Sequence, residues 1–290
     1  MSQPGTDTTV VIENLHFPEC LRWHEDRLFF CDMYGDTVHS YDPETDELRT
    51  VAEVFHPGGI GWLPDGRMLV VASEDRRILE VGDFGNRPYA DLDGIVPGWL
   101  NDILVDDTGR IYAGNFGYDL FGEEPRPTQL AIIDTDGTVT MQADDVLFPN
   151  GMVKRSDGAL IVAETFAHAL TSFRIADDGV LTREASLSLG DAVPDGICID
   201  ADDHVWISSV YDHEAIRVSP TGELERRPVS QMAFACMLGG TDRQTLFVAT
   251  APDFEPEDRR ASREGRIEAM RVEVPGVGAQ GLGEGDRPGA

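Results

Sequence analysis

The chain has 290 residues, of which 26% are charged and 41% are apolar, the balance of a soluble globular protein with enough chain to bury a large core. Lys and Arg number 23 against 53 Asp and Glu, so the formal net charge is −30. Such a charge repels nucleic acid and anionic membranes, and it favours neutral or cationic partners. We therefore expect a small neutral ligand, with neither nucleic acid nor a membrane as partner.

Several features predict a cytoplasmic location. No stretch approaches the ~18 consecutive apolar residues that a membrane-spanning helix needs. The N-terminal sequence MSQPGTDTTV lacks the basic and apolar regions of a signal peptide. The four cysteines are scattered without a CxxC spacing, which is typical of reduced, buried thiols.

One strand pattern recurs six times along the chain. In each copy a short apolar strand follows a turn rich in Asp and Gly, and another short strand precedes that turn, so each pair predicts a β-hairpin. The first apolar residue after the turn recurs at intervals of 41, 42, 49, 45 and 41 residues, at Leu28, Leu69, Ile111, Leu160, Val205 and Leu246. A second hairpin follows in most copies, which makes four strands per repeat.

Six repeats of four strands predict an all-β fold, a six-bladed β-propeller with a central tunnel, whose sheet edges are hidden by radial closure. A β-sandwich would not explain so regular a spacing. We assign residues 9–274 to the propeller, and residues 1–8 and 275–290 to disordered ends, the latter a flexible, Gly-rich tail. The longest insertion, residues 117–129, is a candidate lid over one mouth of the tunnel.

Equivalent positions of the repeats carry oxygen-bearing side chains. Counting back ten residues from each strand marker, or nine in the tighter first copy, gives Glu19, Gly59, Asn101, Asn150, Asp195 and Cys236. Because the blades of a propeller surround one axis, the two carboxylates and two amides would converge near the tunnel. Such hard donors suit Ca²⁺, Mg²⁺ or Mn²⁺, and two unpaired carboxylates are costly to bury without a cation. The alternative is that Asn and Asp before Gly serve only as turn formers.

The same segments carry a family resemblance. Pro-Glu at 18–19, Asn-Asp at 101–102, PNGM at 149–152 and PDGICID at 194–200 stand in this order at the spacing of the blades. They resemble the gluconolactonase / senescence marker protein / luciferin-regenerating enzyme family over roughly residues 10–255. The resemblance implies a six-bladed propeller, one divalent cation in the tunnel, and the hydrolysis of lactones.

Carried over residue by residue, the resemblance implies roles for individual side chains. Glu19, Asn150 and Asp195 match the family's metal ligands, with Ca²⁺ the first expectation and Zn²⁺, Mn²⁺ or Mg²⁺ as alternatives. Asn101 matches an Asn that contacts the substrate or the metal-bound water. A Glu that helps to bind sugar substrates falls near Asp119.

Trp99 departs from the sugar lactonases of that family, which carry Arg two residues before the matching Asn. With Trp in place of Arg, the fork of hydrogen-bond donors is missing and the indole adds apolar surface. Phe148, beside Asn150, adds further apolar surface. We therefore predict a lactone or simple ester that is less polar than gluconolactone.

The expected reaction is hydrolysis, in which the metal polarises the carbonyl and activates water while Asp195 accepts a proton. Two alternatives stay open: a phosphotriesterase that uses the same metal site, and a non-catalytic ligand-binding propeller. The sequence leaves the oligomeric state open.

Overall fold

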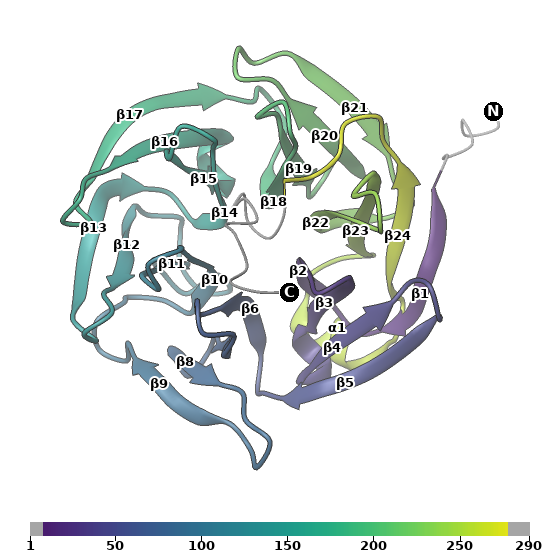
Figure 1. The fold of residues 1–290 in the computed structure, drawn as a ribbon, viewed down its shortest axis with the longest axis horizontal. Coiled ribbons are helices and arrows are strands. Elements are labelled where there is room, and N and C mark those ends of the chain that lie inside the picture. Colours follow the sequence, from purple (N-terminus) through teal and green to yellow (C-terminus); the bar gives the residue numbers. More distant parts are fainter. Residues whose placement is uncertain (1–7, 278–290) are drawn as a thin grey trace.

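The computed structural model describes residues 8–277 and consists of six four-stranded antiparallel sheets around one axis, which confirms the predicted six-bladed propeller (Figure 1). From the axis outward, the first three blades contain β2 (Pro18–His24), β3 (Arg27–Asp32), β4 (Thr37–Asp42) and β5 (Glu47–Glu53); β6 (Pro57–Trp62), β7 (Met68–Ala72), β8 (Arg77–Glu80) and β9 (Arg87–Asp91); and β10 (Leu100–Val105), β11 (Ile111–Asn115), β12 (Thr128–Ile133) and β13 (Val139–Val146). The other three contain β14 (Pro149–Lys154), β15 (Leu160–Glu164), β16 (Ala169–Ile175) and β17 (Leu181–Ser188); β18 (Pro194–Ile199), β19 (Val205–Ser209), β20 (Glu214–Val218) and β21 (Leu224–Pro228); and β22 (Met232–Gly239), β23 (Thr245–Ala251), β24 (Gly265–Arg271) and β1 (Thr9–Leu15).

The repeated Asp-Gly turns form the hairpins between the first two strands of most blades. Gly66 and Gly158 both adopt φ of 87°, a left-handed conformation that glycine tolerates without steric cost. The six innermost strands run side by side around the axis, and β2 contacts both β6 and β22, so the ring is closed (Figure 1). Apolar clusters fill the space between neighbouring blades, with Leu28 and Leu69 among their fully buried members.

The N-terminal strand β1 closes the last blade rather than the first. It pairs antiparallel with β24, with Ile12 opposite Ile267 and Leu15 opposite Gly265 (Figure 1). Both Ile12 and Leu15 are buried in the cluster between the last and first blades. The two ends of the propeller are therefore joined by hydrogen bonds of one sheet, a device that hides the strand edge that β24 would otherwise expose.

The two ends assigned to disorder lie mostly outside the described residues, namely 1–7 and 278–290. Thr8 donates a hydrogen bond to the Glu268 carboxylate at 2.9 Å. At the other end, Pro275 accepts a hydrogen bond from the backbone of Ala201, and Gly276 forms a bridge with Asp200. The first described residues of the Gly-rich tail are thus bound to the propeller, at the end of the tunnel where the innermost strands finish.

One short α-helix was not predicted from the sequence. The connection between β23 and β24 carries the short helix α1 (Pro256–Ala261), which packs against the 3₁₀ turn η1 (Met33–Gly35) of the first blade. Pro256 at the first turn fits the start of a helix, since its missing N–H would be unpaired there in any case. This connection lies at the mouth of the tunnel, defined here as the end where the innermost strands begin.

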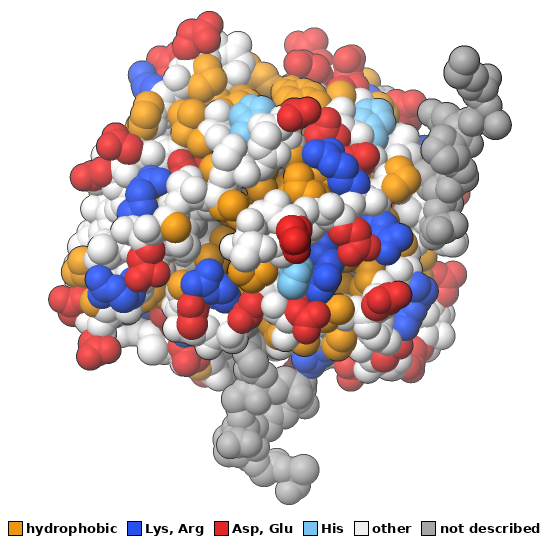
Figure 2. Space-filling view, turned by 90° about the horizontal axis from the view of Figure 1, so that it is seen from above, with side chains coloured by type: hydrophobic (Ala, Val, Ile, Leu, Met, Phe, Trp, Pro, Cys, Tyr) orange, Lys and Arg blue, Asp and Glu red, His pale blue; other side chains and the backbone are white. Residues whose placement is uncertain are grey.

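The surface agrees with the acidic composition. Acidic side chains are scattered over the whole visible face in Figure 2, with Lys and Arg interspersed among them, so no basic patch stands out on that face. Among the described residues, no helix is long and apolar enough to cross a bilayer.

Candidate active site

The innermost strands bend at the register where the sequence places its oxygen-bearing side chains. The antiparallel register slips between Glu19 and Arg22 in β2, Leu100 and Ile103 in β10, Pro149 and Met152 in β14, and Pro194 and Ile197 in β18. Such a bulge bends a strand and redirects a side chain. Asn101, Asn150 and Asp195 lie inside these bulges, and Glu19 lies at the edge of the first.

These four residues line one cavity at the mouth of the tunnel. Asn101, Asn150 and Asp195 are 8%, 6% and 7% exposed, so their polar groups have left bulk water. The cavity volume is ≈ 90 Å³, several times what a single water molecule occupies. The structure therefore brings together the four oxygen-bearing residues that the repeat register predicted to converge.

Hydrogen bonds hold both amides in place. The Asn150 Nδ2 donates to Thr165 Oγ1 at 3.2 Å, and the Asn101 Nδ2 donates to the Pro149 carbonyl at 3.3 Å. Each amide nitrogen is thus engaged within the protein, and each amide oxygen can serve as a ligand atom. Close packing of the innermost strands supports this arrangement, because a Cβ at Gly151 would lie 2.5 Å from the Ile197 nitrogen.

The two carboxylates have environments that disfavour their charge. Burial raises the pKa of Glu19 well above its usual value, and the nearby charge of Asp195 raises it further. Burial also raises the pKa of Asp195, against the effect of a hydrogen bond from Asn150. No Lys, Arg or His is among the described residues that line the cavity. Two carboxylates and two amide oxygens without a cationic side chain form a donor set that fits a hard divalent cation.

The rest of the cavity wall is apolar and mostly aromatic. Beside the four oxygen-bearing residues and Thr165, its lining consists of Phe17, Met33, Tyr34, Trp99, Phe116, Leu120, Phe121, Phe148, Phe166, Val193, Val210, Tyr211, Phe234 and Phe254. The rings pack against one another: the Phe116 and Phe148 centroids are 4.6 Å apart, and those of Phe17 and Phe234 are also 4.6 Å apart. The cavity thus has a polar floor under an aromatic wall.

The same register explains most of this wall. Two residues before the six equivalent positions stand Phe17, Pro57, Trp99, Phe148, Val193 and Phe234, and five of these line the cavity. A second set of aromatic residues follows the next strand in several blades, with Tyr34 after β3, Phe116 after β11 and Tyr211 after β19. Trp99 and Phe148 were predicted from the sequence, whereas Phe234 and Tyr34 were not, although Phe234 stands at the same position of the repeat as Trp99 and Phe148.

Three other predicted features have distinct outcomes. Trp99 and Phe148 line the cavity as expected. Asp119 does not: it is exposed, its carboxylate accepts a hydrogen bond from the Phe121 backbone at 3.1 Å, and it lines a neighbouring hollow behind Trp99. Of the insertion at 117–129, Leu120 and Phe121 contribute to the wall, whereas residues 128 and 129 already belong to β12.

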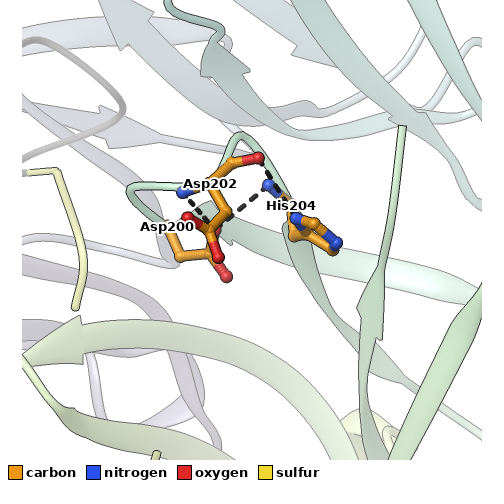
Figure 3. Close-up of side chains that lie close together, drawn as sticks. All are labelled: Asp200, Asp202 and His204. Atoms are coloured by element: carbon orange, nitrogen blue, oxygen red, sulfur yellow. Dashed lines mark hydrogen bonds between the residues drawn. The ribbon is translucent and has the colours of Figure 1, made fainter. Parts of the chain in front are cut away.

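A second acidic group lies at the other end of β18, the strand that carries Asp195. Asp200, Asp202 and His204 place their ligand atoms within 4.8 Å of one another in the turn after β18 (Figure 3). The Asp200 Oδ1 accepts the backbone N–H groups of Asp202 and His204 at 2.9 and 3.1 Å, and its Oδ2 pairs with Arg217 at 2.7 Å.

This group has the properties of a turn. The equivalent Asp106 in the third blade accepts the backbone N–H groups two and four residues later in the same way. Arg217 already supplies the cation for both Asp200 and Asp202. The turn is roughly 15 Å from Asp195 along the strand. The cavity at the mouth is therefore the better candidate for a metal-dependent site.

Comparison with known proteins agrees with the motifs. Residues 17–252 match the family model described as the SMP-30/gluconolactonase/LRE-like region. The chain belongs to this family. The match covers all six blades up to β23 and includes the four oxygen-bearing residues of the cavity floor.

Individual members of the SMP-30/gluconolactonase/LRE-like family are similar over most of their length. Pentonolactonase XacC from Haloferax volcanii is 31% identical over 258 residues, which is 85% of each chain. A solved luciferin-regenerating enzyme superposes with a TM-score of 0.81 at 16% identity, over 96% of this chain and all of that one. A solved calcium-binding regucalcin from Agrobacterium tumefaciens superposes with a TM-score of 0.77 at 18% identity, over 94% of this chain and 96% of that one. At such identities the structural matches establish the fold alone.

Proposed function

We propose that this chain hydrolyses a lactone or simple ester with an apolar substituent, with the aid of one divalent cation held by Glu19, Asn150 and Asp195. The observation that carries the proposal is the cavity itself, in which oxygen donors without a cationic partner form the floor of an aromatic chamber. Membership of the SMP-30/gluconolactonase/LRE-like family and the similarity to a pentonolactonase support lactones as the substrate class. The regucalcin neighbour, a calcium-binding protein, supports Ca²⁺ as the first metal to test.

Individual residues of the cavity floor have separate roles in the proposed hydrolysis. A bound divalent cation would supply a Lewis acid for the carbonyl oxygen and would lower the pKa of a neighbouring water molecule. Asp195 takes the proton that the attacking water releases, since its carboxylate lines the cavity and is held there by a hydrogen bond from Asn150. Asn101 orients the water or the substrate carbonyl through its amide, which the Pro149 carbonyl holds in place.

The aromatic wall determines which substrates fit. Trp99, Phe148 and Phe234 offer apolar surface and few hydrogen-bond partners, so a polyhydroxylated sugar lactone would lose its bonds to water without replacement. An alkyl or aryl substituent gains about 25 cal/mol for each Å² of apolar surface that it buries there. The wall also keeps bulk water from the floor, which strengthens the electrostatic interactions around the reacting carbonyl.

The test is hydrolysis of a panel of aldonolactones, alkyl γ- and δ-lactones, an aryl ester and a phosphotriester, after removal of metal with EDTA and after re-addition of Ca²⁺, Mg²⁺, Mn²⁺ or Zn²⁺. We expect turnover of the alkyl lactones to disappear with EDTA and return with metal. Asp195→Asn should lower kcat/KM about 10²- to 10⁴-fold. Asp202→Asn, which removes an exposed carboxylate of the distal turn, is the matched control and should keep full activity.

Other results would replace the proposal. Turnover of the phosphotriester alone would make the protein a phosphotriesterase. Binding of both metal and lactone without turnover would make it a ligand-binding propeller. Full activity in EDTA, or loss of activity in Asp202→Asn but not in Asp195→Asn, would show that the cavity floor has been misassigned.

A further inference from the structure

A buried ion pair joins two of the innermost strands next to the cavity floor, on the side away from the mouth. The Arg22 guanidinium in β2 and the Asp102 carboxylate in β10 have side chains that are 3% and 6% exposed. The Nη2 of Arg22 lies 2.5 and 2.6 Å from the two carboxylate oxygens. Among the described residues of the six innermost strands, Arg22 is the only buried Arg or Lys.

The guanidinium also joins three neighbouring blades. Its Nε donates to the Ile60 carbonyl in β6 at 3.2 Å, and its Nη2 donates to the Ile103 carbonyl in β10 at 3.1 Å. Its Nη1 donates to the Leu21 carbonyl of its own strand at 2.9 Å. Arg22 therefore connects the strands that carry Glu19 and Asn101, two of the four oxygen-bearing residues of the floor.

Cys20 links this pair to the floor. Its backbone N–H donates to the Glu19 carboxylate at 2.9 Å, while its Sγ donates to Asp102 at 3.3 Å and accepts the Ile60 N–H at 3.0 Å. Asp102 directly follows Asn101 and accepts the backbone N–H of Ile103 within the same bulge, at 2.8 Å. The pair thus contacts the floor through the chain segments on which Glu19 and Asn101 stand.

The charges of Arg22 and Asp102 matter for the neighbouring floor because both side chains are shielded from solvent. A buried guanidinium keeps its proton, so an unpaired Arg22 would place a fixed positive charge beside the site proposed for a divalent cation. A buried ion pair adds little stability over apolar side chains of the same volume, so stability alone does not account for this one.

We propose that Asp102 is a charge-balancing residue of the cation site. It neutralises Arg22, which connects the innermost strands β2, β6 and β10, and so permits a cation to bind on the adjacent floor. The inference rests on the function proposed above. It assigns Asp102 a role toward the cation that a turn former or a purely structural residue would not have.

The test is the dissociation constant for Ca²⁺, measured by titration calorimetry on the full chain after EDTA treatment, with circular dichroism and Tm to verify folding. The variants are Asp102→Asn, Arg22→Gln and the double variant Arg22→Gln/Asp102→Asn. We expect Asp102→Asn to raise the Kd about tenfold or more, because it leaves Arg22 unpaired. The double variant should restore the Kd to within about threefold of the unmodified protein, although it has lost more hydrogen bonds.

Arg22→Gln alone provides an independent comparison if Asp102→Asn does not fold. It leaves the Asp102 charge unopposed, so we expect Ca²⁺ to bind at least as tightly as in the unmodified protein. A structural role for the pair predicts the opposite, namely weaker binding in Arg22→Gln and no recovery in the double variant, and either result would overturn the inference. Absence of Ca²⁺ binding in the unmodified protein would instead overturn the proposed function together with the inference.

Discussion

At the scale of single residues, the site depends on two positions that are two residues apart at the start of four innermost strands, β2, β10, β14 and β18. In these four strands the apolar residue directly precedes the first residue of the strand and lies nearer the mouth than the oxygen-bearing residue, and both line the cavity. Phe148 and Asn150, or Trp99 and Asn101, illustrate this pairing. In the proposed function, the donor position supplies the chemistry and the position two residues earlier selects the substrate.

Trp99 offers a direct test of that division. In Trp99→Arg, a guanidinium would face the cavity and offer several donors to hydroxyl groups, while apolar surface would be lost. We expect the ratio of kcat/KM for an aldonolactone to that for an alkyl lactone to rise about tenfold or more. Steady-state kinetics with both substrates measures the ratio, and Trp99→Phe, which keeps the apolar surface, is the control. An unchanged ratio in Trp99→Arg would show that Trp99 does not select the substrate.

At the scale of elements, the connection that carries α1 completes the wall of the cavity. Phe254 lines the cavity, and Arg260 on α1 lies over the Tyr34 and Phe55 rings and pairs with Asp36 at 3.4 Å. Arg260 also contacts the buried His56. The helix is therefore attached to the first and second blades by a small set of polar contacts.

The His56 contact predicts a pH dependence for this element. Burial and the Arg260 charge lower the pKa of His56, against the opposing effect of Glu74 and Asp36, so the imidazole is neutral in the folded protein at neutral pH. The neutral imidazole therefore stabilises the folded protein above the ordinary His pKa of about 6.5. This stabilisation is lost as the pH falls through the lower pKa that His56 has in the folded state. Protonation would leave no lone pair for Arg260 to donate to.

We expect amide hydrogen exchange of residues 254–261 to accelerate, relative to the rest of the propeller, between about pH 7 and pH 5 after correction for the intrinsic rates. In His56→Gln the amide can still donate to Glu74 and accept from Arg260, but it does not titrate. The acceleration should therefore be absent in that variant. Equal acceleration in both proteins would exclude His56 as its cause.

At the scale of the whole molecule, closure of the ring depends on β1. Removal of residues 1–15 would expose the edge of β24 and would remove Ile12 and Leu15 from the core. Burial of these two side chains contributes about 3 to 6 kcal/mol. For a chain of this size, we expect Tm to fall on the order of 10 °C, with aggregation through the exposed edge. Thermal unfolding measures the effect, and removal of residues 1–7 is the control; equal Tm values for the two truncations would show that β1 is dispensable.

Much of the architecture could be predicted from the sequence because a propeller is local. Each hairpin is formed by residues close together in the chain, and most repeat the same turn chemistry, as the turns at Gly66 and Gly158 show. The repeat register then relates distant positions without knowledge of the tertiary structure. Glu19, Asn101, Asn150 and Asp195 could be grouped for this reason from the sequence alone.

The sequence alone therefore determined the number of blades and the register of the oxygen-bearing residues, because both follow from the repeat. It also determined the acidic surface, which follows from the composition. The tertiary structure decided what depends on contacts outside the repeat. The pairing of β1 with β24, the position of α1 at the mouth, the exclusion of Asp119 from the cavity and the Arg22–Asp102 pair all belong to this second group. Each of them depends on how segments lie in space that no local periodicity relates, and only the closed ring fixes that arrangement.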